Sequence, residues 1–90
     1  SNFVGIDATL YPNPVTDVLT ITTNLPTNAH NTLTLTDVYG KAIRSIAIDA
    51  NNTGSYTTNF DGLANLPSGV YFVVISSNNS IVKTLKWLKD

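Results

Sequence analysis

Residues 70–76, with the sequence VYFVVIS, form the most apolar stretch of the chain. Their β-branched and aromatic side chains fall on both faces of an extended backbone, which is typical of a strand in the middle of a sheet. Gly69 comes directly before this stretch, and the polar residues 77–80 (SNNS) follow it as a short loop of the hairpin type. We therefore predict a central strand that is entered through a glycine and followed by a tight turn.

Further strand candidates precede this central strand, because apolar and polar side chains alternate along them. They are residues 18–23, 33–36, 42–48 and 56–60. The chain has no Glu and no Met, so two good helix formers are absent, and its 90 residues are enough for a single domain. These features predict an all-β fold, an immunoglobulin-like antiparallel β-sandwich of about seven strands.

The alternation also predicts which apolar side chains are buried in the sandwich. The predicted core contains Leu19, Ile21, Leu35, Ile46, Phe60, Val70, Phe72, Val74 and Leu85. The terminal segment 81–89 fits two structures, since three of its apolar residues recur at helical spacing while its β-branched residues and the preceding hairpin loop favour a strand. We favour an edge strand, protected by lysines against pairing with the wrong partner, and the helix remains the alternative.

The composition argues against several classes of function. A net charge of -1 and a pI near 5.5 offer no basic surface for nucleic acid. The absence of cysteine excludes disulfides and thiol nucleophiles, and no apolar run is long enough for a transmembrane segment. His30, the only histidine, is placed in a polar loop with no Asp or Cys close to it in sequence. We therefore expect no enzyme activity, no metal site and no cofactor.

Four short motifs stand out, and each has a local structural reason. They are LYPNPV at 10–15, DVYGK at 37–41, LPSGVYFV at 66–73 and a lysine-bearing end at 83–89. The two prolines fix an extended boundary, and the glycines of the second and third motifs permit sharp changes of direction. Together, and in this order, the motifs resemble the type A C-terminal sorting domain of the type IX secretion system, or Por secretion system.

This resemblance implies a division into an entry segment, residues 1–9, which is a possible cleavage region, and the sorting domain, residues 10–90. It implies a signal that directs a cargo protein across the outer membrane to the cell surface or the extracellular space. The implied partners are the outer-membrane translocon and sortase-like components, one of which removes the domain on surface attachment, and the domain is expected to be a monomer. The implied recognition residues are Tyr11, Pro12, Asn13, Pro14, Asp37, Gly40, Lys41, Leu66, Gly69, Tyr71, Lys83, Lys86 and Lys89.

A second interpretation is a carbohydrate-binding or adhesive β-sandwich module of a secreted protein. It requires Tyr11, Tyr56 and Trp87 to form an exposed, coplanar stacking platform. Aromatic residues of small sandwiches more often lie in the core. The exposure of Trp87 therefore distinguishes the two interpretations.

Overall fold

The computed structural model describes residues 6–50 and 55–90, and this part of the chain contains seven strands and one short 3-10 turn. The 3-10 turn η1 (Leu63–Asn65) lies between β5 and β6, and its Leu63 is buried. The strands are β1 (Ala8–Tyr11), β2 (Leu19–Asn24), β3 (His30–Thr36), β4 (Ala42–Asp49), β5 (Ser55–Phe60), β6 (Gly69–Ser77) and β7 (Ser80–Lys89).

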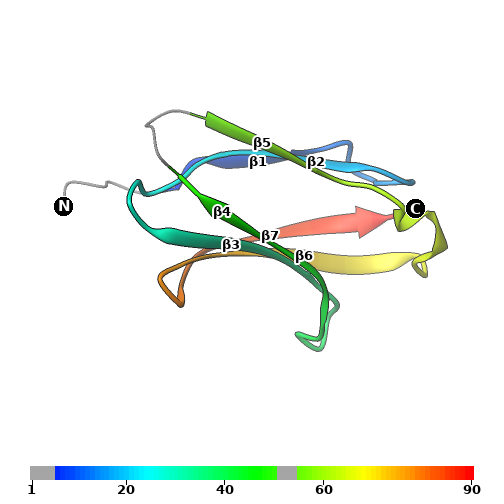
Figure 1. Ribbon diagram of the computed structural model, residues 1–90. Helices are drawn as coiled ribbons and strands as arrows, with labels where there is room; N and C mark the ends of the chain where they lie inside the picture. The colour runs from blue at the N-terminus through cyan, green and yellow to red at the C-terminus, as the bar shows by residue number, and fades with distance from the viewer. Residues whose placement is uncertain (1–5, 51–54) are drawn as a thin grey trace.

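The strands form two layers that pack face to face (Figure 1). One sheet has three strands in the order β1-β2-β5, and the other has four in the order β4-β3-β6-β7, with antiparallel pairing of every neighbouring strand. This grouping matches the constant-type immunoglobulin arrangement, except that the fourth strand pairs with the third. The predicted all-β, immunoglobulin-like sandwich is confirmed, and β6 lies inside its sheet as expected.

The core between the sheets contains four of the predicted residues, Leu19, Ile21, Leu35 and Phe60. In β6 the predicted face is wrong. The side chains that point into the core are Tyr71, Val73 and Ile75, whereas Val70, Phe72 and Val74 are half-buried on the outer face. Because both faces of this strand are apolar, the alternation gave no information about which one is covered.

Two further residues depart from the predicted core. Ile46 is exposed although its partner Leu33 is fully buried, because β4 is the outermost strand of a sheet one strand wider than the sheet that covers it. Leu85 is half-buried, and the large side chain that β7 buries completely is Trp87. Residues 81–89 therefore form an edge strand, as favoured, and not a helix.

The strand β1 was not predicted. Ala8 and Thr9, which the sequence placed in the entry segment, pair with Thr23 and Thr22 of β2. The strand has four residues and ends directly before Pro12, so it is too short to show a clear alternation. Residues 1–5 of the entry segment lie outside the described residues.

Candidate recognition surface

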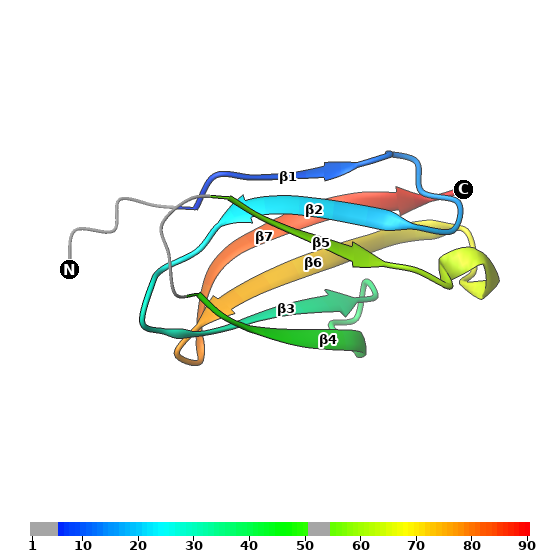
Figure 2. The same ribbon diagram turned by 45° about the horizontal axis from the view of Figure 1, so that its top comes forward.

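Three of the sequence motifs and the C-terminal residues of the fourth meet at one end of the sandwich, which we call the motif end (Figure 2). Thr36, directly before the DVYGK turn, pairs with Phe72 of β6. At the start of β6, Gly69 pairs with Lys89 at the end of β7, and Lys89 forms a parallel bridge with Val15. The motifs therefore lie side by side across this end, although they span most of the sequence.

The DVYGK turn is held by the side chain of its first residue. The Asp37 carboxylate oxygen Oδ1 accepts hydrogen bonds from the backbone N–H groups of Tyr39 and Lys41, both at 2.9 Å. Gly40 has φ of 82°, a conformation that favours glycine, as the sequence predicted. The two residues at the tip, Val38 and Tyr39, project into solvent, and Tyr39 is 92% exposed. The motif residues of this turn thus fix its backbone.

Tyr71 of the LPSGVYFV motif is part of the core. Its hydroxyl donates a 2.7 Å hydrogen bond to the carbonyl oxygen of Pro67, four residues upstream. This is the tyrosine corner of immunoglobulin-like sandwiches, in which a tyrosine near the start of the sixth strand fastens the preceding connection. The Tyr71 ring also stacks on Trp87 with 4.8 Å between ring centroids. Tyr71 therefore couples the entry of β6 to the end of β7.

The YPNP residues close the outer edge of β7 at its C-terminal end. The peptide bonds before Pro12 and Pro14 are both cis. Between the prolines, the Asn13 side-chain oxygen accepts a 3.0 Å hydrogen bond from the backbone N–H of Leu88. The Val15 N–H donates to the Leu88 carbonyl at 2.7 Å, and the Asp90 N–H donates to the Val15 carbonyl at 2.8 Å. Tyr11, at the end of β1, is exposed.

The three lysines of β7 do not form one cluster. Lys83 lies on the same face of the strand as Leu85, whereas Lys86 lies on the outer face, and both are exposed. Lys89 is buried, and its Nζ donates to the backbone carbonyl of Asp90 at 2.9 Å. The lysines of the terminal motif therefore do not present a single patch of three positive charges. The two exposed charges flank the edge of β7 from opposite faces.

A cleft of about 420 Å³ separates the DVYGK turn from the connection that precedes β6. The residues that line it are Asp37, Lys41, Ala42, Ile43, Leu66, Pro67 and Tyr71. The cleft thus brings together residues of two motifs that are about 30 positions apart in sequence.

A family model, described as secretion system C-terminal sorting domain, matches residues 9–89. The chain belongs to this family. It is therefore a C-terminal sorting signal of the type IX secretion system, and such signals mark proteins for export across the outer membrane to the cell surface or the extracellular space. No curated protein and no solved structure matches this chain. Within the described residues, no helix is long and apolar enough to cross a membrane.

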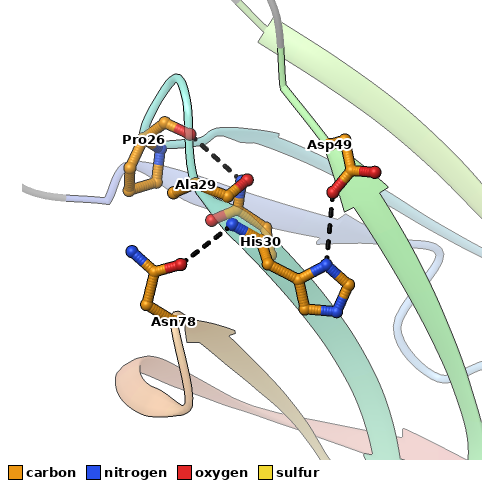
Figure 3. A network of polar contacts seen from close by, with 6 residues as sticks. Pro26, Ala29, His30, Asp49 and Asn78 are labelled. Carbon is orange, nitrogen blue, oxygen red and sulfur yellow. Dashed lines mark hydrogen bonds and ion pairs between the residues drawn. The ribbon is translucent and has the colours of Figure 1, made fainter.

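The opposite end of the sorting domain carries a polar network that the sequence did not reveal (Figure 3). His30 is the first residue of β3, not a loop residue, and its Nδ1 lies 3.2 Å from a carboxylate oxygen of Asp49. Its backbone N–H donates to the side chain of Asn78 at 3.0 Å, and Asn78 donates its own N–H to the His30 carbonyl at 2.8 Å. These contacts join three segments that are distant in sequence.

The buried neighbour of His30 completes this network. Asn31 donates from its side-chain nitrogen to the carbonyl oxygens of Pro26 and Ala29, at 3.1 and 3.3 Å. These bonds secure the loop between β2 and β3. His30 and Asp49 are both largely exposed, and no group of three metal-ligating side chains occurs within residues 6–50 and 55–90. In the sorting domain the His30–Asp49 pair links the first residue of β3 to the last residue of β4.

The stacking platform required by the carbohydrate-binding interpretation does not form. Trp87 has 0% exposure and packs against Tyr71 inside the core, so its ring is not available to a sugar. Tyr11 alone among the three aromatic residues is clearly exposed. The sorting domain therefore lacks the feature that the second interpretation requires.

Proposed function

We propose that outer-membrane components of the type IX system, the translocon and a sortase-like protease, recognise this domain as a folded monomer that has no catalytic activity of its own. The supporting observation is the position of the motif end relative to the incoming chain. The Asp7 backbone N–H donates to the side-chain oxygen of Asn24, at the opposite end of a molecule 40 Å long. A cargo attached before residue 1 therefore leaves the motif end accessible.

The same geometry restricts the positions at which the sortase-like protease can cleave the chain. A protease requires an extended chain that is not paired with another strand. Ala8 and Thr9 are paired with β2, so they are protected while the sandwich is folded. We propose that cleavage occurs before Ala8, and mass spectrometry of the new C-terminus of a processed reporter tests this position. A terminus within β1 or beyond it would contradict the proposal.

The proposed monomer is supported by the charges on β7. Pairing of this edge with a second copy would bring the positive charges of Lys83 and Lys86 close to their equivalents, and like charges on neighbouring strands are destabilising. Sedimentation analysis of the purified domain should show a single species of monomer mass, 9.7 kDa. A dimer at micromolar concentration would contradict this part of the proposal.

Fusion of residues 1–90 to the C-terminus of a periplasmic reporter, in a strain with a type IX system, tests recognition of the folded domain. We expect secretion of the wild-type fusion and its loss in Ile21→Asp, because Ile21 is fully buried and a charge there unfolds the core. Thr22→Asp is the matched control in the same strand, since Thr22 lies on the outer face. Secretion of the unfolded Ile21→Asp fusion at the wild-type level would show that folding is not required.

A further inference from the structure

The outer edge of β7 is closed at one end and open along the rest. Both backbone groups of Leu88, its N–H and its carbonyl, bond to the connection between β1 and β2 and thus point away from β6. In an antiparallel pair these directions alternate along the strand. The N–H and carbonyl groups of Lys86 and Thr84 therefore point away from β6 as well. Within the described residues, β7 pairs only with β6 and, at Lys89, with Val15.

The side chains around this open segment have no partner for their charges. Lys83 and Lys86 flank the edge from opposite faces, and neither takes part in an ion pair within the described residues. At the other edge of the same sheet, by contrast, the Arg44 guanidinium donates to the carbonyl of Asp61 and lies 3.7 Å from its carboxylate. The positive charge on the β7 edge is thus available, whereas the charge on the β4 edge is already paired.

The same segment also exposes apolar surface. Ile81 is 69% exposed and Val82 is 39% exposed. Val82 lies at a register shift in β7, where Ile75 pairs with Lys83 and Ser76 pairs with Ile81. Open backbone groups, exposed aliphatic side chains and free lysines are the features that an added strand would satisfy, since main-chain hydrogen bonds provide affinity and alternate side chains provide specificity. A second copy of this chain fits poorly because its lysines repel those already present.

We propose that the edge of β7 from Ile81 to Lys86 binds an extended acidic segment of an outer-membrane component of the export machinery, which adds to the four-stranded sheet as a fifth strand. Carboxylates on both faces of the added strand meet Lys83 and Lys86, and its backbone bonds to Thr84 and Lys86. The proposal rests on the proposed function and specifies the kind of contact that the machinery makes.

Thr84→Pro in the full reporter fusion tests this contact. Proline removes an N–H that points away from β6, so the bonds between β6 and β7 remain while the open edge is blocked. We expect the secreted fraction to fall roughly tenfold or more at an unchanged melting temperature. Thr84→Ala, which keeps the N–H, should be secreted like the wild type. Wild-type secretion of a folded Thr84→Pro fusion would overturn the proposal.

A charge variant keeps the test decisive if Thr84→Pro fails to fold. The double substitution Lys83→Glu with Lys86→Glu leaves the backbone edge intact and alters only exposed side chains. We expect it to lower secretion by a similar factor, and secretion at the wild-type level would overturn the acidic partner. A monomer–dimer equilibrium abolished by Thr84→Pro would instead identify a second copy as the occupant. Failure of the wild-type fusion to be secreted would contradict the proposed function itself.

Discussion

The two halves of β7 belong to one strand but have different surroundings. In the second half, Trp87 and Lys89 are buried, and Asn13 and Val15 close the outer edge. In the first half, from Ile81 to Lys86, most side chains are exposed and the outer edge is open. The comparison shows that a lysine-bearing terminal motif contains two kinds of residue. Some anchor the strand in the fold, and others remain free to contact a partner.

The largest expected effect is a difference in the free energy of unfolding between variants in the two halves of β7. Trp87→Ala should lower the free energy of unfolding by about 3–5 kcal/mol, because a fully buried ring is lost and a cavity is left. Ile81→Ala, the matched change in the exposed half, should cost less than about 0.5 kcal/mol. Urea denaturation of both variants measures the difference. Equal costs would show that the two halves do not differ in packing.

A smaller effect is expected at the contact between the anchored half and β6. Tyr71→Phe keeps the ring stacked on Trp87 but removes the hydrogen bond to the Pro67 carbonyl. We expect a loss of about 1–2 kcal/mol, since a part-buried acceptor loses its partner. Tyr39→Phe is the control, because that hydroxyl is at an exposed turn tip. If secretion of Tyr71→Phe falls more than its stability explains, Tyr71 also contacts the export machinery.

The smallest expected effect concerns the closed edge itself. Asn13→Ala should cost about 1 kcal/mol, because the Leu88 N–H loses its acceptor. Amide hydrogen exchange should become faster at Leu88 and stay unchanged at Leu85, whose N–H points toward β6. The exposed Asn65 provides a control substitution to Ala with no expected change. Unchanged exchange at Leu88 would show that Asn13 does not close this edge in solution.

Local features of the fold could be predicted from the sequence, because local chemistry determines them. The DVYGK turn follows from an Asp side chain that accepts backbone N–H groups and from a glycine with positive φ. The strand at 81–89 follows from β-branched residues after an Asn-Asn hairpin, in which Asn78 and Asn79 both have positive φ. Neither inference required knowledge of distant contacts.

The features that were missed depend on contacts between distant residues. The core-facing side of β6 is the side that the other sheet covers. Because both faces of this strand are apolar, the sequence does not indicate which side that is. Lys89 forms a bridge with Val15 and is buried. The sequence pattern does not distinguish it from the two exposed lysines of the same strand. The His30–Asp49 pair joins residues 19 positions apart across two strands. For the same reason, the sequence predicts candidate recognition residues but not which of them are exposed.

Site-specific photo-crosslinking in secreting cells tests the central claim most directly, that the open half of β7 contacts the export machinery. A photoreactive residue replaces Val82 in one fusion and Thr57, on the outer face of the other sheet, in a second. Both fusions are first shown to be secreted at the wild-type level. We predict a crosslink to an outer-membrane component from position 82 and none from position 57. The same crosslink from position 57, or none from position 82, would contradict the claim.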